Sequence, residues 1–230
     1  RRAQGPRLQS LSENDLPDGF PMHGDDRSGR RLWIGAMDDF PVTLSRAVFM
    51  DRDGTINEEV GYLSRLDQMK LFPRSAEAIR LLNREGIKVV VVTNQSGVAR
   101  GYFGEDFVSE AHAFLQESLR REKAFIDAFY YCPHHPTEGA FPYRQACSCR
   151  KPEAGMLLRA SRDLHIDLSR SYMVGDVMKD VRAGKKAGTK GILVKTGYGA
   201  GEKTDEDPVP DYVAVDLLDA VNWILEDLAR

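Results

Sequence analysis

From Ser45 onward, short apolar runs alternate with segments whose apolar residues recur at helical spacing. The run over residues 88–93 is almost continuous valine, which is typical of a strand buried on both faces of a sheet. Further strands are predicted over residues 47–50, 128–131, 172–174, 192–194 and 212–215, and helices over residues 75–85, 105–122, 152–165, 179–187 and 217–228. This alternation predicts an α/β fold, a parallel sheet with helices on both faces.

Several residues indicate where these elements begin and end. Ser75 is suited to cap the first helix, and Gly86 to end it. Pro152 is suited to the first turn of the helix over residues 152–165. The stretch 197–211 is rich in Gly, Asp and Pro, which predicts a loop.

Residues 1–44 differ from the rest of the chain. Gly, Pro, Ser, Asp and Arg are frequent there and show little periodicity, so we expect a flexible arm. The alternative is an ordered extension that the apolar trio Leu32-Trp33-Ile34 attaches to the domain. Residues 45–230 are long enough for one domain with a single core.

Composition narrows the function classes. Of the 230 residues, 42% are hydrophobic, and 32 Lys and Arg stand against 35 Asp and Glu, for a formal net charge of −3. A broad basic surface is therefore excluded, and we expect no nucleic-acid partner. No apolar run approaches the about 20 residues that span a bilayer, so no membrane association is expected. Three cysteines, an odd number, argue against a disulfide framework and favour a reducing, cytoplasmic compartment.

Polar residues that could take part in catalysis or ligand binding follow four of the predicted strands. Because ligands of such sheets bind at the carboxyl ends of the strands, these positions are the informative ones. Each signal alone has an ordinary explanation, such as an Asx turn or a helix-capping loop. The four groups are Asp51-Arg52-Asp53-Gly54-Thr55, Thr93-Asn94-Gln95-Ser96-Gly97, Cys149-Arg150-Lys151-Pro152, and Gly175-Asp176 with Asp180.

Together these groups supply what phosphoryl transfer through an aspartyl phosphate needs. One carboxylate attacks phosphorus, a second handles the proton of the leaving group, and cations neutralise the phosphoryl oxygens. The acidic cluster of Asp51 and Asp176 also suits a hard cation such as Mg²⁺.

The order and spacing of these groups resemble the four motifs of the haloacid dehalogenase-like (HAD) phosphatases. The longer strings Asp-Arg-Asp-Gly-Thr-Ile-Asn, Val-Val-Thr-Asn-Gln-Ser-Gly, Tyr-Tyr-Cys-Pro-His-His-Pro and Cys-Arg-Lys-Pro are similar to those of the heptose bisphosphate phosphatases, with the histidinol-phosphate phosphatases as near relatives. The resemblance covers about residues 47–229 and implies a Rossmann-like sheet. No stretch between the motifs is long enough for a large cap domain.

The resemblance implies a role for each matching residue. Asp51 would be the nucleophile and Asp53 the general acid and base, while Thr93 and Lys151 would stabilise the transferring phosphoryl group. Mg²⁺ would be held by Asp51, Asp53 and Asp176. Asp180 either orients Lys151 or is an ordinary exposed helix acid. Substrate contacts would come from Glu59, Val60, Gly61, Tyr62, Thr93, Asn94, Gln95, Ser96, Arg150 and Lys151.

All three cysteines fall in one short segment, residues 132–149. Three thiols and one imidazole suit a tetrahedral structural Zn²⁺ site, although the C-x-H and C-x-C spacings are less common than C-x₂-C. The predicted ligands are Cys132, His134, Cys147 and Cys149. His135 is the alternative ligand, and the resemblance favours His134. Ordinary reduced cysteines beside an incidental histidine are the competing interpretation.

The expected function is Mg²⁺-dependent removal of the 7-phosphate of a heptose 1,7-bisphosphate, with a small phosphorylated sugar as substrate and a monomeric enzyme. The first alternative is histidinol-phosphate phosphatase. A zinc-stabilised binding module without catalytic activity is the alternative from another class. Arg150 beside Lys151 would suit a second phosphate and so favours a bisphosphate.

Overall fold

The computed structural model describes residues 44–198 and 207–230, which belong to one compact unit, Thr43–Arg230. The arm expected over residues 1–44 lies outside the described residues except for Leu44. Residues 199–206 of the loop expected over residues 197–211 lie outside them as well.

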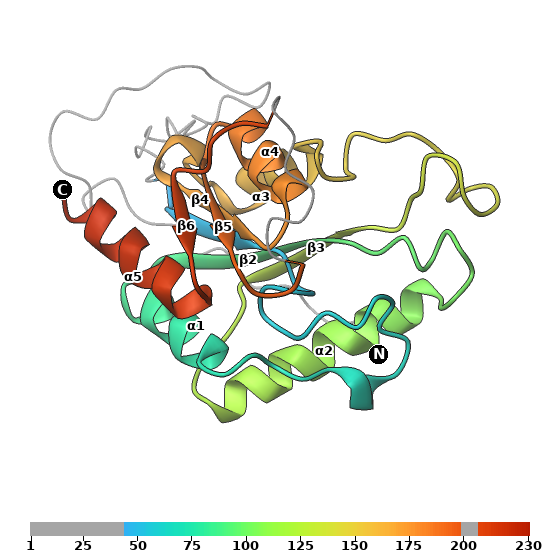
Figure 1. Cartoon of the computed structure of the whole chain (residues 1–230), viewed down its shortest axis with the longest axis horizontal. Helices are drawn as coiled ribbons and strands as arrows, with labels where there is room; N and C mark the ends of the chain where they lie inside the picture. The colour runs from blue at the N-terminus through green and yellow to red at the C-terminus, as the bar shows by residue number, and fades with distance from the viewer. Residues whose placement is uncertain (1–43, 199–206) are drawn as a thin grey trace, which may run out of the picture. The chain divides into compact units, whose positions relative to one another are not determined.

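The described residues contain one parallel sheet of six strands in the order β3-β2-β1-β4-β5-β6 (Figure 1). The strands are β1 (Ala47–Met50), β2 (Lys88–Asn94), β3 (Ala128–Cys132), β4 (Tyr172–Gly175), β5 (Lys190–Val194) and β6 (Tyr212–Ala214). All residues of β1 and β4 are buried, as expected for strands covered on both faces. The predicted α/β fold with a parallel sheet is confirmed.

Helices cover both faces of this sheet. They are α1 (Ser75–Arg84), α2 (Glu105–Arg121), α3 (Gly155–Leu164), α4 (Met178–Ala187) and α5 (Leu217–Leu228), with short 3₁₀ turns η2 (Leu66–Gln68) and η3 (Leu168–Arg170). Successive strand residues alternate between the faces. Val48 and Met50 pack in a core with α1, α2 and α5, while Ala47 and Phe49 pack with α3 and α4 (Figure 1).

The predicted start of α1 at residue 75 is confirmed, but its predicted cap is wrong, and so is the predicted start of α3. Ser75 is the first residue of α1 rather than its cap, and Arg74 precedes the helix in the left-handed region. Pro152 does not begin α3, which starts three residues later at Gly155, after a cis peptide bond between Lys151 and Pro152. Gly86 does follow the end of α1, at a φ of 66° that glycine adopts readily.

The strand order determines where a ligand can bind. The chain passes from β1 outward to β2 and β3 and then returns to the other side of β1 to form β4. The connections after β1 and β4 therefore diverge, and a crevice opens at the carboxyl ends of these two strands. The acidic groups of residues 51–55 and of Gly175-Asp176 follow these two strands.

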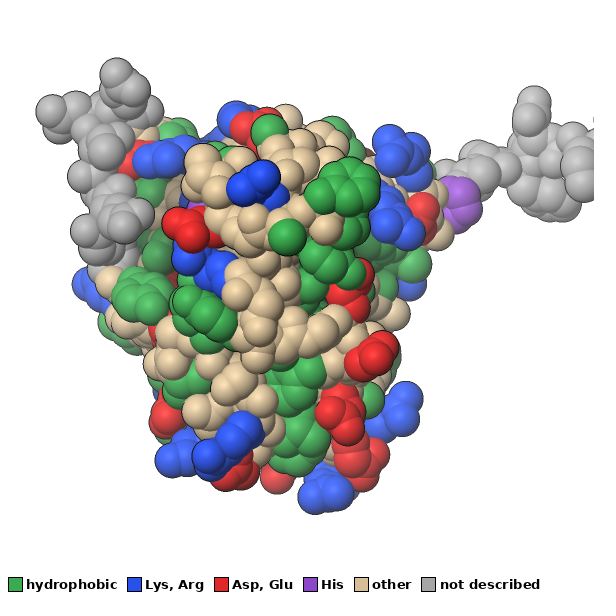
Figure 2. Space-filling model, turned by 90° about the vertical axis from the view of Figure 1, so that its right-hand side faces the viewer, with side chains coloured by type: hydrophobic (Ala, Val, Ile, Leu, Met, Phe, Trp, Pro, Cys, Tyr) green, Lys and Arg blue, Asp and Glu red, His purple; other side chains and the backbone are tan. Residues whose placement is uncertain are grey.

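No helix among the described residues is long and apolar enough to cross a membrane. Figure 2 shows the face of the molecule that lies on the right-hand side in Figure 1. Basic and acidic side chains are interspersed there, with hydrophobic side chains between them. This face therefore does not present a uniformly basic surface.

His112 of α2 should make the stability of the fold sensitive to mild acid. Its ring is 7% exposed and stacks on Phe129 with 4.6 Å between ring centroids. Burial, followed by the charge of Arg52, lowers the pKa of His112 to about 3. Between that value and the unfolded pKa of about 6.5, only the unfolded chain binds the proton, so stability falls as the pH drops.

We expect the free energy of unfolding to fall between pH 6.5 and pH 5, by up to about 1.4 kcal/mol per pH unit from this residue. Denaturant titrations at several pH values measure the slope. His112→Phe should flatten it, whereas His165→Asn, at an exposed histidine, should not. An unchanged slope in His112→Phe would contradict the assignment.

Candidate active site

The predicted catalytic residues converge on one cavity at the carboxyl ends of the central strands. Its volume is about 230 Å³. Most of the residues expected from the sequence line it: Asp51, Asp53, Glu59, Gly61, Tyr62, Thr93, Asn94, Gln95, Ser96, Arg150 and Asp176. Val60 and Lys151 do not. The side chain of Val60 is exposed, and Lys151 lies beneath Asp51 in the protein interior.

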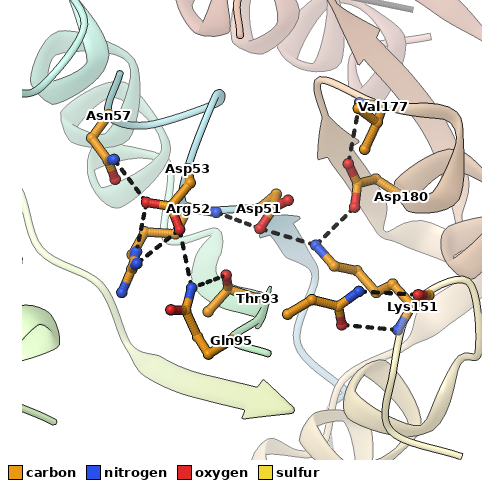
Figure 3. A network of polar contacts seen from close by, with 10 residues as sticks. Asp51, Arg52, Asp53, Asn57, Thr93, Gln95, Lys151, Val177 and Asp180 are labelled. Atoms are coloured by element: carbon orange, nitrogen blue, oxygen red, sulfur yellow. Dashed lines mark hydrogen bonds and ion pairs between the residues drawn. The ribbon is translucent and has the colours of Figure 1, made fainter. Parts of the chain in front are cut away.

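Lys151 forms a buried ion-pair chain with two carboxylates (Figure 3). Its Nζ atom lies 3.0 Å from Asp51 Oδ1 and 2.7 Å from Asp180 Oδ1, and its side chain is fully buried. Burial by itself would lower the pKa of Lys151, but the charges of Asp180 and Asp51 outweigh it and raise this pKa above its usual value. Lys151 therefore remains an ammonium, paired with both carboxylates.

The position of Asp180 settles the two interpretations that its sequence context allows. Asp180 lies in the first turn of α4, is fully buried, and holds Lys151 from the side opposite Asp51. Its Oδ2 accepts a hydrogen bond of 3.3 Å from the Val177 amide. It is therefore an ion-pair partner of Lys151 and not an exposed helix acid.

Asp53 is surrounded by hydrogen-bond donors. Arg52 donates to both oxygens, from Nε to Oδ1 at 3.1 Å and from Nη2 to Oδ2 at 2.7 Å. Asn57 donates to Oδ1 at 2.9 Å and Gln95 to Oδ2 at 3.0 Å (Figure 3). Burial alone would raise the pKa of Asp53, but these contacts, led by the charge of Arg52, hold it below its usual value. Asp53 is thus a carboxylate in the free protein.

The end of β2 and the residue that follows it support Asp53 and Lys151. Gln95 Nε2 donates to Thr93 Oγ1 at 2.9 Å as well as to Asp53. Asn94 pairs with the backbone of Lys151, accepting from its amide and donating to its carbonyl, each at 3.0 Å. The predicted substrate contacts Asn94 and Gln95 therefore use their amide groups within the protein, where they fix Lys151 and Asp53.

Asp176 faces Asp51 across the cavity. One oxygen each of Asp51, Asp176 and Asp180 lies within 4.8 Å of the others. Burial, then the charges of Asp51 and Asp180, raises the pKa of Asp176 to about 7, although the Tyr198 amide donates to its Oδ2 at 2.9 Å. The carboxylates outnumber the one ammonium among them. The donor set of buried oxygens and excess negative charge fits a hard divalent cation.

The wall of the cavity contains residues that the sequence analysis did not identify. Lys179 and Tyr198 line it, and Arg52, 1% exposed, supports it from below. Lys179 lies one helical turn after Asp176, a spacing that could have been noticed. Tyr198 follows β5, where no motif was recognised, and only the tertiary structure brings it to Asp176.

Burial and the charge of Asp53 raise the pKa of Glu59, at the rim, to about 7. The buried hydroxyl of Thr55 has no hydrogen-bond partner among the described residues.

A second cluster lies beside this cavity. Cys132, His134, Cys147 and Cys149 bring four donor atoms within 4.8 Å of one another. The sulfur atoms lie 3.2 to 3.5 Å apart, and His134 Nδ1 is 3.6 Å from Cys132 Sγ and 3.4 Å from Cys149 Sγ. A tetrahedral zinc site with Zn–S distances of about 2.3 Å separates its sulfur atoms by about 3.7 Å, so the set fits such an ion.

His135, the alternative ligand, does not join this cluster. Its Nδ1 accepts from the Glu138 amide at 2.9 Å, and its Nε2 lies 3.2 Å from Arg100 Nη2.

Comparison with known proteins agrees with the motifs. The HAD-hydrolase-like family pattern matches residues 148–220. The chain is 48% identical over 155 residues to the D-glycero-β-D-manno-heptose-1,7-bisphosphate 7-phosphatase of Pasteurella multocida, covering 67% of this chain and 84% of that protein. It is 41% identical over 185 residues to the enzyme of the same name from Escherichia coli K12, covering 80% and 90%.

A solved structure shows the same fold. The D,D-heptose 1,7-bisphosphate phosphatase of B. bronchiseptica, complexed with magnesium and phosphate, superimposes with a TM-score of 0.70 at 32% identity, covering 79% of this chain and 99% of that one. Fold and site thus define a phosphoric monoester hydrolase of the HAD type. Within that class, the chain belongs to the family that contains these heptose bisphosphate phosphatases. The predicted family resemblance is confirmed.

Gly175 should be required for the position of Asp180. A Cβ atom at Gly175 would overlap the Asp180 side chain, which has no room to move in the interior. Gly175→Ala should therefore displace Asp180 from Lys151, lower turnover at least about tenfold and destabilise the fold by about 1–3 kcal/mol.

Phosphate-release kinetics and thermal unfolding measure these effects. Gly104→Ala is the matched control, because the added Cβ would approach no heavy atom beyond the Asp106 amide nitrogen, at an ordinary 4.0 Å. Equal behaviour of the two variants would show that the Gly175 contact does not matter.

Proposed function

We propose that this protein removes the 7-phosphate of D-glycero-D-manno-heptose 1,7-bisphosphate through a phospho-Asp51 intermediate. The observation that carries the proposal is the buried chain Asp51–Lys151–Asp180 beneath a cavity that Asp53 and Asp176 also line. The names of the relatives from P. multocida and E. coli supply the substrate. Because these relatives are phosphatases, they favour an enzyme over a binding module without catalytic activity.

Asp51 is suited to attack phosphorus. It is 7% exposed, lies at the carboxyl end of β1, and its Oδ1 accepts a 2.7 Å hydrogen bond from the Arg52 amide. Lys151 Nζ lies 3.0 Å from the same oxygen and fixes the position of the carboxylate. The buried ammonium also offsets the negative charge that gathers on the phosphoryl oxygens, while Thr93 lines the cavity as a hydroxyl donor.

Asp53 transfers the proton in both steps. In the first step it donates to the oxygen of the departing sugar, and in the second it accepts a proton from the water that hydrolyses phospho-Asp51. A phosphate dianion beside Asp53 raises the pKa of this carboxyl from its low value in the free protein, which favours the protonated form for the first step.

Mg²⁺ is the cation proposed for the site, held by Asp51, the backbone carbonyl of Asp53 and Asp176. When bound, it neutralises the repulsion between the Asp51 carboxylate and the phosphate dianion. The buried oxygen donors and the raised pKa of Asp176 support this placement, as does the magnesium and phosphate in the related structure from B. bronchiseptica.

Zn²⁺ is proposed for Cys132, His134, Cys147 and Cys149. The site is complete with four protein donors, which is characteristic of a structural ion. Arg150 follows Cys149 directly and donates to the His134 carbonyl at 3.1 Å, so the ion would fix Arg150 at the edge of the cavity. We propose that Arg150 binds the second phosphate of the bisphosphate.

Steady-state phosphate release with Mg²⁺ tests the substrate. The α and β anomers of heptose 1,7-bisphosphate are compared with histidinol phosphate and a simple aryl phosphate. A kcat/KM preference of about a hundredfold for one bisphosphate anomer, equal to about 2.7 kcal/mol, is the expected result. A preference for histidinol phosphate would replace the proposed function with the alternative in the same fold.

The roles proposed for Asp51 and Asp53, which follow β1, predict different losses. Asp51→Asn should abolish turnover, because an amide cannot form the covalent intermediate. Asp53→Asn should slow turnover by about 10²–10⁴-fold, since proton transfer is lost while the nucleophile remains. Asp106→Asn, at an exposed acid of α2, should leave kcat unchanged. Near-normal rates in Asp51→Asn would remove the covalent mechanism.

The Cys/His cluster predicts one zinc ion per chain. Metal analysis of the purified protein should detect it, and Cys147→Ser should lose it and lower the melting temperature. His135→Gln should keep it, because His135 lies outside the cluster. Turnover that is unchanged in folded protein stripped of zinc would sink the proposed link between the ion and Arg150.

Several expectations remain predictions from the sequence. They are the start of the catalytic domain at residue 45, the monomeric state, the absence of nucleic-acid and membrane partners, and the cytoplasmic location.

A further inference from the structure

Three segments meet beside the mouth of the cavity. The metal loop, residues 133–149, carries most of the Cys/His cluster. The β2 turn, residues 95–104, follows β2. The Tyr62 loop, residues 58–63, forms one wall of the cavity. Arg100 of the β2 turn contacts both of the other segments.

The contacts of Arg100 with the metal loop are polar. Its Nη2 lies 3.2 Å from His135 Nε2, and its Nη1 lies 3.6 Å from Glu138 Oε2. The neighbouring Gly139 packs directly on the Ala99 carbonyl, at a φ of 86° and with no room for a side chain. The metal loop therefore rests on the β2 turn through backbone as well as side-chain contacts.

The contact of Arg100 with the Tyr62 loop is a cation–π interaction. The guanidinium carbon lies 5.7 Å from the centroid of the Tyr62 ring. Tyr102 of the same turn meets Tyr62 edge-on, with 4.8 Å between ring centroids. Tyr62 lines the cavity and is 41% exposed, so these two contacts hold an aromatic ring that is otherwise free to turn into solvent.

Burial strengthens this arrangement. The Arg100 side chain is only 25% exposed, and its Nε atom is enclosed. A guanidinium that is largely removed from water interacts more strongly with an aromatic face than an exposed one does. The planar fork of Arg reaches two polar partners while its face stays available for the ring, which Lys cannot reproduce.

We propose that Arg100 is a positioning residue that fixes the Tyr62 ring against the sugar of the substrate. Through the same contacts, Arg100 couples the conformation of the metal loop to that of the Tyr62 loop. The proposal rests on the proposed function and on the substrate contact that the family resemblance implies for Tyr62, which lines the cavity. Arg100 itself does not line the cavity and acts through Tyr62.

The test compares Arg100→Met and Arg100→Lys with Arg144→Met, a control at an exposed arginine of the metal loop. Each variant is assayed with the preferred sugar phosphate and with a simple aryl phosphate, which has no sugar for Tyr62 to contact. Arg100→Met should raise KM for the sugar phosphate about tenfold and change kcat less than about threefold. Values for the aryl phosphate should stay unchanged, and Arg100→Lys should restore part of the loss.

A cycle with Tyr62→Ala tests the route. If Arg100 acts through Tyr62, the double variant should be no worse than Tyr62→Ala alone. Equal losses on both substrates, or additive effects in the cycle, would overturn the proposal. Should Arg100→Met fail to fold, Glu138→Gln removes the Glu138 contact and should raise KM for the sugar phosphate in the same selective way.

The wild-type arm separates the two ideas. A wild type that prefers another sugar phosphate contradicts the proposed function, and the role of Arg100 is then decided on that substrate. A wild type that prefers the heptose bisphosphate, together with Arg100→Met at wild-type KM, contradicts only the role of Arg100.

Discussion

A fully buried ammonium cannot stand alone in a protein interior, and the site is organised around this constraint at Lys151. Removing a charge from water costs several kcal/mol unless partners replace the solvent. Asp51 and Asp180 are those partners, and they come from the connections after β1 and β4. Asn94 fixes the backbone of the same lysine from the end of β2. Three strand ends are thereby joined at one lysine. Displacing Asp51 or Asp180 removes one of the two charges that compensate the buried ammonium, and displacing Asn94 removes both of its hydrogen bonds to the Lys151 backbone.

The same crevice contains two carboxylates in opposite electrostatic environments. Arg52, Asn57 and Gln95 surround Asp53 and lower its pKa, whereas Asp176 lies near Asp51 and Asp180 and has a pKa raised to about 7. Side chains of the protein already compensate the negative charge of Asp53, whereas the negative charge around Asp176 requires a further positive charge. That contrast, rather than the number of acids, supports a cation beside Asp176 and a proton-transfer role for Asp53.

Much of the fold was predictable because parallel strands buried on both faces need continuous apolar runs, and the run over residues 88–93 is an unambiguous example. Local signals were weaker where tertiary contacts compete. Pro152 is suited to a helix start, yet α3 begins only at Gly155, whose position against the Ser148 carbonyl leaves no room for a side chain. Asn94 and Gln95 are expected to contact substrate and do line the cavity, but nothing in the sequence indicated that their amide groups also bond to Lys151 and Asp53.

The sequence alone determined the α/β class, the two carboxylates that follow β1, and the three cysteines of the Cys/His cluster, because spacing within a motif fixes which side chains share a strand end or a loop. The choice of His134 as the fourth member, and the roles expected of the two carboxylates, came from the family resemblance. Only the tertiary structure decided that Asp180 is buried against Lys151, that Arg52 satisfies Asp53, that Tyr198 lies at Asp176, and that Arg100 contacts Tyr62. These residues act through contacts with segments that are remote in the sequence, or through their burial. Neither the contacts nor the burial can be inferred from the spacing of residues within a motif. They depend on how the sheet brings its strand ends together.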